Sequence, residues 1–246
     1  MDQVLLIGTV AAAFLFAFVN GWHDGFNVVA TSVLSRSMSP ARALFLASAA
    51  AVAGALILGT AVAKTLGSEL IHAGLSGPGE MVPLVLIALS AVISALTWNL
   101  MTWAMGHSPS SSHALVGGLL GGALAARGLG VVVWKTLSWK ILAVLLIAPP
   151  LGTLLGQWAL SLSRRVLRRS PPSGREFFTR RQSLGLVFLS AGHGANDAQK
   201  AMGIITMALV SSGSIPGFSV PLWVVLGCGG ALAAGIFVGG CKIVKV

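Results

Sequence analysis

A few ionisable side chains stand inside otherwise apolar stretches of this sequence, and they are the residues best suited to chemistry. They are Asp24, Asp197 and Lys200, with His23, His113 and His193 nearby. A carboxylate at membrane depth is costly unless it is paired or hydrated, so such residues usually serve a function. The alternative for each aspartate is an ordinary capping role at a helix end. The recurrence of two aspartates in similar contexts favours the functional interpretation.

The two aspartates limit what such a site can bind, because two carboxylates repel an anion. A sodium ion or a proton would neutralise them and would help to hold an anion beside them. The sequence therefore predicts coupled transport, with the cation held by Asp24, Asp197, Asn27 and Asn196. Sodium and proton sites both use carboxylates and amide oxygens, so the coupling cation stays open.

A serine-rich run, Ser108 to Ser112, precedes His113 and predicts the start of a helix after a break. Serine caps and an early proline favour helix initiation, and the unpaired amides there carry the positive end of the helix dipole. Hydroxyls and amides at a helix N-terminus form a site for a tetrahedral oxyanion. The alternative is a flexible turn. The charge-free stretches on both sides favour an anion site at Ser110, Ser111 and Ser112.

Amide side chains near these groups suit either ligand, because their carbonyl oxygens bind cations and their N–H groups donate to oxyanions. Lys200 has three open roles: to pair with Asp197, to contact the anion, or to extend toward the membrane interface. His23 and His193 are either proton-coupling groups or hydrogen-bond partners. No catalytic residue, certain metal ligand or cofactor other than the coupling cation is predicted. The residues predicted to bind the oxyanion are Ser110, Ser111, Ser112, Asn20, Asn27, Asn196, Gln199 and Lys200.

The elements that position these residues follow from composition. The 246 residues are 55% hydrophobic and 9% charged, where a soluble domain has roughly 25% charged residues. Several charge-free stretches are long enough for helices that cross a bilayer, which need about 20 apolar residues. We therefore predict an all-α, polytopic transmembrane helical bundle. The predicted spans are 4–19, 43–63, 82–104, 112–126, 141–163, 183–210 and 221–240.

The basic residues indicate how the chain is oriented. Of the 16 basic residues, 7 lie in 164–181, so the net charge of +10 indicates a cytoplasmic loop rather than nucleic-acid binding. We expect a multi-pass protein of the plasma membrane, with the lipid bilayer as a partner and nucleic acid excluded. Residues 1–163 would form a first membrane repeat of about five spans, and 182–246 would begin a second one.

The two aspartates also suggest an internal repeat. Gly21-Trp22-His23-Asp24 aligns with Gly194-Ala195-Asn196-Asp197, and each run is expected to interrupt an apolar helix. The spans predicted between them place the two copies in opposite directions across the membrane. Inverted-topology repeats with broken helices are typical of secondary transporters, whose sites lie where those helices meet.

Three blocks, 20–33 (NGWHDGFNVVATSV), 98–118 (WNLMTWAMGHSPSSSHALVGG) and 192–206 (GHGANDAQKAMGIIT), resemble the inorganic phosphate transporter (PiT) family. The resemblance implies a symporter that couples inorganic phosphate to sodium or protons, in some bacterial members as a neutral metal complex. It also implies that the signature aspartates are Asp24 and Asp197, the asparagines Asn27 and Asn196, and the substrate loop Ser110 to Ser112.

Two departures from the family pattern qualify this expectation. Phe26 stands where the family usually has a small residue, which would crowd the first broken helix. Family members also continue beyond the position of Val246 with a second Ser/Thr-rich loop. The expectation is therefore a C-terminally truncated chain, or one part of a split transporter that requires a complementing C-terminal half or a homo-oligomer.

Two competing functions are open at this point. One is a non-transporting remnant of a transporter. The other is an intramembrane serine hydrolase in which Ser111, His113 and Asp24 serve as nucleophile, base and orienting group. That enzyme would lack a Gly-x-Ser-x-Gly elbow and would leave Asp197 unexplained, so we expect no enzymatic activity.

Overall fold

The structure is a computed structural model that describes residues 2–71, 81–107, 110–168 and 172–241. The described residues are helical apart from connecting turns and one isolated bridge between Ile71 and Val132. The helices are α1 (Asp2–Leu34), α2 (Pro40–Ile57), α3 (Ala61–Lys64), α4 (Met81–Ala104), α5 (Ser111–Arg127), α6 (Trp134–Thr136), α7 (Ala143–Arg168), α8 (Pro172–Ser211) and α9 (Leu222–Cys241), with π-helical η1 (Thr65–Glu69) and η4 (Leu137–Leu142) and 3₁₀-helical η3 (Leu129–Val131).

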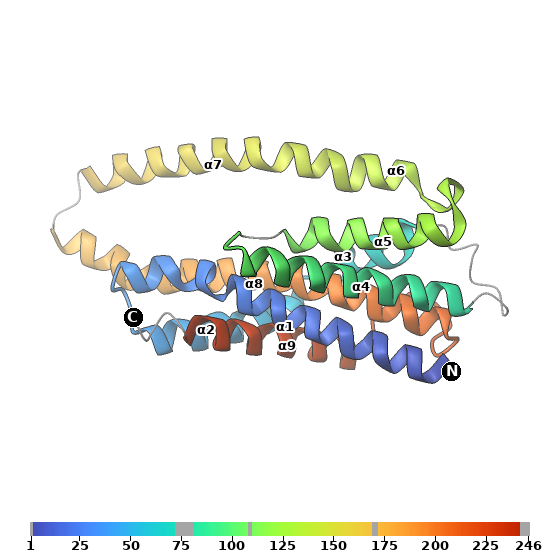
Figure 1. Cartoon of the computed structure of the whole chain (residues 1–246). Helices are drawn as coiled ribbons and strands as arrows, with labels where there is room; N and C mark the ends of the chain where they lie inside the picture. The colour runs from blue at the N-terminus through green and yellow to red at the C-terminus, as the bar shows by residue number, and fades with distance from the viewer. Residues whose placement is uncertain (1, 72–80, 108–109, 169–171, 242–246) are drawn as a thin grey trace.

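The expected all-α membrane bundle is confirmed. In the described part of the chain, the segments long and apolar enough to cross a membrane are Gln3–Leu34, Pro40–Ile57, Leu84–Ala104, Trp134–Val166 and Leu222–Gly240. The other two predicted spans, 112–126 and 183–210, lie within α5 and α8 of the same bundle (Figure 1). Helix α5 has only 17 residues, which is short for a membrane span, and α8 carries the ionisable residues Asp197 and Lys200.

Helix α8 is the central element of the bundle. It packs against α1, α2, α4 and α9, and its segment from Asp197 to Leu209 is buried throughout. Helix α1 packs against α9 and α4, and α5 packs against α4. Figure 1 shows that α1 and α8 run in opposite directions. The two aspartate-bearing helices therefore meet as antiparallel neighbours.

The predicted interruptions at Gly21–Asp24 and Gly194–Asp197 are wrong, because α1 and α8 run through both sequences without a break. The glycines instead allow close helix packing. A Cβ atom on Gly194 would lie 2.1 Å from the carbonyl oxygen of Ala51 in α2, and one on Gly21 would lie 2.0 Å from that of Leu232 in α9. Small residues at such crossings let membrane helices approach closely.

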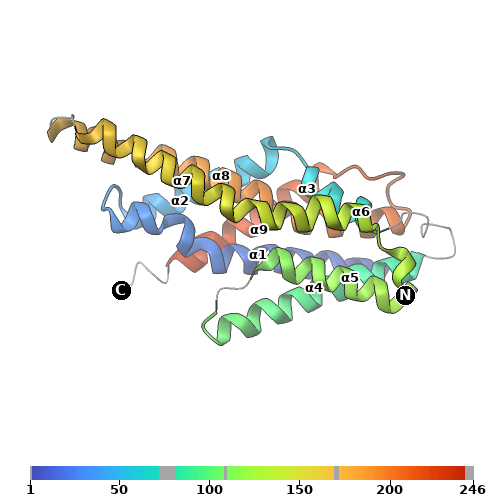
Figure 2. The same ribbon diagram turned by 90° about the horizontal axis from the view of Figure 1, so that it is seen from above.

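The predicted loop at 164–181 is also largely helical. Residues 164–168 complete α7 and residues 172–181 begin α8, so the arginines of these two ranges belong to the ends of two helices. Helix α7 itself lies along one edge of the molecule, outside the packed bundle (Figures 1 and 2). None of the residues in the most apolar part of Trp134–Val166 is buried.

Candidate functional site

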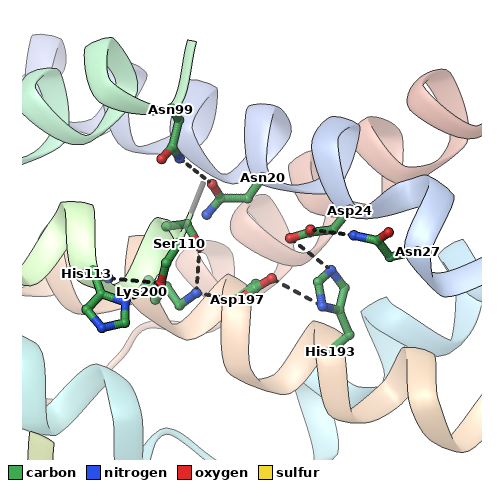
Figure 3. Close-up of polar contacts among 10 residues, drawn as sticks. Asn20, Asp24, Asn27, Asn99, Ser110, His113, His193, Asp197 and Lys200 are labelled. Carbon is green, nitrogen blue, oxygen red and sulfur yellow. Dashed lines mark hydrogen bonds and ion pairs between the residues drawn. The ribbon is translucent and has the colours of Figure 1, made fainter. Parts of the chain in front are cut away.

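A cavity of about 430 Å³ brings together residues from α1, α8 and the start of α5. It lies beside the crossing of the two aspartate-bearing helices (Figure 3). Its lining residues are Asp24, Asn27, Val28, Ser110, Ser111, Ser112, Leu189, His193, Asp197 and Lys200. Most of the predicted site residues therefore share one cavity, although they are separated by up to 176 positions in the sequence.

The two aspartates lie close together, with a histidine between them. His193 Nδ1 is 3.2 Å from Asp197 Oδ2, and His193 Nε2 is 3.9 Å from Asp24 Oδ2. One ligand atom from each of the three residues lies within 4.8 Å of the others. His193 Nε2 is buried and has no hydrogen-bond partner, which leaves a polar gap between the imidazole and Asp24. Three groups with this spacing can share a proton or enclose a small cation.

Lys200 completes the charged cluster. Its side chain is 3% exposed, and its ammonium group pairs with Asp197 and donates a hydrogen bond to Ser111 Oγ at 2.8 Å. With a neutral histidine, two carboxylates and one ammonium leave the cavity with one net negative charge. An anion can enter it at low electrostatic cost only after a further positive charge is bound.

The serine turn faces the carboxylates from the N-terminus of α5. The predicted helix start is confirmed, since Ser110 caps α5 and accepts a hydrogen bond from the His113 amide at 3.4 Å. Ser110 Oγ also lies 2.5 Å from His113 Nδ1. Ser110, Ser111 and Ser112 all line the cavity, so hydroxyls and the positive end of a helix dipole face it. Ser108 and Pro109 lie outside the described residues.

The predicted hydrolase triad is not assembled. His113 bonds to Ser110 rather than to the proposed nucleophile, and Ser111 instead accepts its hydrogen bond from Lys200. The histidine in contact with Asp24 is His193.

The predicted amide residues divide according to the helix face they occupy. Asn27 lines the cavity and donates a hydrogen bond to Asp24 Oδ1 at 3.4 Å, one helical turn away. Asn196 precedes Asp197 directly and is turned by about 100° around α8, so its exposed side chain lines a different cavity. Phe26 is likewise 47% exposed and is not among the lining residues, so it does not crowd the site.

Gln199 does not line the cavity and has a structural task. Its Oε1 accepts hydrogen bonds from the amides of Val62 at 2.8 Å and Ala63 at 3.4 Å, and its Nε2 donates to the carbonyl of Gly59 at 2.6 Å. The side chain thus satisfies the backbone where the chain turns between α2 and α3. The prediction that Gln199 contacts the anion is not supported by this placement, because the residue lies two positions from Asp197 and faces away from it.

Asn20 is buried beneath the site and pairs with a residue that sequence reasoning missed. Asn99 Nδ2 donates to Asn20 Oδ1 at 3.1 Å, and each side chain is 1% exposed. Beside this pair, the ring of His23 stacks on Trp103, with centroids 5.7 Å apart. Both contacts join α1 to the end of α4 that leads to the serine turn. Asn99 could have been singled out in the sequence, because it is an asparagine inside a charge-free apolar stretch.

Comparisons with known proteins show what the whole chain is similar to. A model of the phosphate transporter family matches residues 20–175 and 168–246. A probable low-affinity inorganic phosphate transporter of Rhizobium meliloti is 40% identical over 98% of this chain and 70% of its own length. Namesakes from Bacillus subtilis and Mycobacterium leprae are 36% and 38% identical, and the chain spans 71% and 58% of their lengths. A solved structure named "The sodium-dependent phosphate transporter" matches 98% of this chain and 77% of its own, with a TM-score of 0.78 and 24% identity, and so shares the fold.

Proposed function

The chain belongs to the phosphate transporter family, and from this premise we propose that it moves inorganic phosphate across the plasma membrane in symport with a cation. The chain spans only 58% of the length of the Mycobacterium leprae relative. The transport activity of a whole family member is therefore itself a proposal for this chain. Phosphate would bind at Ser110, Ser111 and Ser112, with Lys200 as its cationic partner. The cation would bind at Asp24 and Asp197, with Asn27 as a neighbour.

The observation that carries the proposal is the balance of charge in the cavity. Serine hydroxyls and the α5 N-terminus offer donors to an oxyanion, while Asp24 and Asp197 oppose it from the other wall. A bound cation removes that opposition and releases Lys200 from its pairing with Asp197. Binding of the anion then depends on binding of the cation, which is the thermodynamic condition for symport.

Two cations fit this arrangement. The imidazole of His193 between the aspartates favours a proton, because histidine exchanges protons readily whereas hard cations prefer oxygen ligands. The structural neighbour is named for its sodium dependence. If this chain binds its cation at the same place as that protein, sodium is the favoured ion. Uptake driven separately by each gradient distinguishes them.

We further propose the predicted arrangement of an inverted repeat, with 1–163 as a first unit, 182–246 as the beginning of a second, and the basic segment 164–181 on the cytoplasmic side. The opposite directions of α1 and α8 support this arrangement. So does the position of Asp24 and Asp197 at the crossing of these helices rather than at separate surfaces. In place of broken helices, the structure has unbroken ones, and the break occurs before α5.

The decisive experiment is radiolabelled phosphate uptake into proteoliposomes that contain only this chain. A proton gradient and a sodium gradient would be imposed in turn. We expect uptake above that of empty vesicles with at least one gradient. Folded protein without uptake under either gradient would reject transport by this chain alone and favour the alternative of a non-transporting or complementing subunit.

The site assignment is tested by Asp24→Asn and Asp197→Asn in the same vesicles. Each substitution removes one charge of the cation site, so gradient-driven uptake should fall at least about tenfold, as expected for loss of a charge-assisted contact. Glu69→Gln is the matched control, since Glu69 is an acidic residue that does not line this cavity, and it should retain coupling. Full gradient-driven uptake by both aspartate variants would refute the assignment.

A further inference from the structure

A second cavity, of about 560 Å³, lies on the other side of the serine turn. It is bounded by α3, η1, the start of α5 and the first half of α7. Ser110, Ser112 and Lys200 line this cavity and the first one, so the two cavities share one wall. The residues of that wall are the ones assigned above to the anion.

The lining of the second cavity differs in charge from that of the first. It includes Lys140, Lys200, Thr65, His113 and Asn196, and none of its described lining residues is acidic. Lys140 is paired with Glu69 at 2.7 Å, yet Glu69 does not line the cavity. Apart from the two serines, the other lining residues are apolar, so the donors are concentrated at the serine wall and around Lys140. Ammonium, hydroxyl and amide donors without a facing carboxylate suit an oxyanion.

A hydrogen bond from Lys200 to Ser111 lies at the wall that the cavities share. Ser111 lines the first cavity, whereas Lys200 lines both. The lysine ammonium sits on a flexible four-carbon stem. It can therefore follow a bound anion from one side of the serine turn to the other while its helix stays in place.

The two cavities are displaced toward opposite ends of the helices. In the first cavity, Asn27 lies near the C-terminal end of α1 and Leu189 on the N-terminal half of α8. In the second, Lys140 lies in η4, at the end of the η4–α7 helix away from Arg168. Two cavities displaced in this way, with a shared wall between them, are compatible with access to one site from both sides of a membrane.

We propose that the second cavity is a separate binding chamber for inorganic phosphate, and that the Lys200–Ser111 contact is the partition between it and the cation-dependent site. This inference rests on the proposed function. The chamber holds phosphate without the coupling cation, because the ammonium groups of Lys140 and Lys200 line it whereas their carboxylate partners, Glu69 and Asp197, do not. The first cavity holds phosphate only with the cation. Phosphate thus stays bound in the second cavity until a cation neutralises Asp24 and Asp197.

Cysteine accessibility tests this proposal without relying on transport. Both native cysteines, Cys228 and Cys241, are replaced by alanine, and Thr65→Cys or Leu189→Cys then places one thiol in the second or the first cavity. A membrane-impermeant thiol reagent is added to either face of oriented proteoliposomes. We expect the two cysteines to react from opposite faces. Inorganic phosphate alone should slow modification of Thr65→Cys, whereas Leu189→Cys should be protected only when the coupling cation is also present.

Substitutions at Lys140 link the protection to the charge of the chamber. Lys140→Gln should raise the phosphate concentration for half-protection of Thr65→Cys about tenfold, the effect of losing one charge-assisted hydrogen bond, and Lys140→Arg should retain protection. If Lys140→Gln does not fold, Ala148→Phe fills the same cavity from α7 and should abolish the protection.

Three results would overturn the inference: reaction of both cysteines from one face, an unreactive Thr65→Cys, or no effect of phosphate on Thr65→Cys. Protection of Leu189→Cys without protection of Thr65→Cys would reject the second chamber and leave the proposed function intact. Absence of protection at both positions, together with absence of uptake, would reject the proposed function itself.

Discussion

The side chains of the site form a charge network rather than a set of independent ligands. Asp197 contacts both His193 and Lys200, and Asp24 reaches the same network through His193. Changing the charge of one member therefore changes the electrostatic potential at the others. A cation at the aspartates and an anion at the serines are coupled through Lys200, since its ammonium serves both sides.

This network makes a testable prediction about the buried pair Asp197–Lys200. Lys200→Met leaves a buried carboxylate without its partner and should lower the free energy of unfolding by about 3–5 kcal/mol. Adding Asp197→Asn in the same chain should recover most of that loss, because no buried charge then stays unpaired. Unfolding in detergent measures both variants.

The matched control is Lys140→Met, which breaks a pair whose lysine side chain is 55% exposed and should cost about 1 kcal/mol or less. An equal loss of stability for the two lysine variants, or a double variant as unstable as Lys200→Met, would contradict the assignment.

At the scale of the helix, glycine serves to bring helices together. The motif glycines flank the aspartates because α2 and α9 must approach the backbones of α8 and α1 at those levels. This packing fixes the positions of Asp24 and Asp197 on two rigid, continuous helices. A site built on such helices is held more accurately than one built on loops.

Gly194 and Gly192 provide a matched pair of substitutions on one helix. A Cβ on Gly194 would lie 2.1 Å from a backbone oxygen of α2, whereas one on Gly192 would meet nothing within 4 Å. Gly194→Ala should destabilise the protein by about 1–3 kcal/mol through overpacking. Gly192→Ala should be neutral or stabilising by up to about 1 kcal/mol, because alanine favours the helix. Unfolding midpoints in detergent measure both. Equal effects would show that close packing of α2 and α8 is not the reason for Gly194.

The two π-helical segments, η1 and η4, are joined by the ion pair of Glu69 and Lys140. The hydrogen bond from the Lys140 ammonium, aided by the Thr65 hydroxyl, lowers the pKa of Glu69 in the folded protein. A lowered pKa means that this pair stabilises the fold above the unfolded pKa of about 4.3. The stabilisation is lost as pH falls through the lower folded value.

Unfolding midpoints of the wild type and Glu69→Gln, measured between neutral and acid pH, test this effect. The wild type should be more stable near neutral pH by at most about 1 kcal/mol, as for exposed pairs. The difference should vanish once the carboxyl is protonated. A difference that grows toward acid pH would have the wrong sign and would exclude the pair as its source.

At the scale of the whole molecule, α7 is the feature that sets the protein apart from a compact bundle. It continues from η4, whose Lys140 pairs with Glu69 of η1, and its first half lines the second cavity. The apolar and unburied character of Trp134–Val166 agrees with a position of α7 in lipid or against other membrane helices, and Figure 2 shows the length of this helix. The basic ends of α7 and α8 give the molecule its charge asymmetry.

That asymmetry predicts the orientation of the chain. Ser163 is exposed near the basic end of α7, and Ser219 is exposed beyond the other end of α8. In intact cells, an impermeant thiol reagent should modify Ser219→Cys, whereas Ser163→Cys should react only after permeabilisation. Both variants require the background without native cysteines. The reverse pattern would place the basic segment outside the cell.

The sequence alone was sufficient for the features that depend on local composition. Charge-free apolar stretches predicted the membrane helices, isolated aspartates identified the charged centre, and the run before His113 predicted the capped start of α5. Each of these is determined by residues close together in the chain, through hydrophobicity, desolvation cost and capping.

The tertiary structure decided which faces of the helices meet. It placed His193 between the aspartates, joined Lys200 to Ser111, turned Asn196 into a second cavity and assigned Gln199 to the backbone of the α2–α3 turn. It also showed that Gly21 and Gly194 are sites of close helix packing instead of helix breaks. These outcomes depend on the approach of helices that are distant in the sequence, and a rotation of about 100° per residue decides whether a side chain reaches the site.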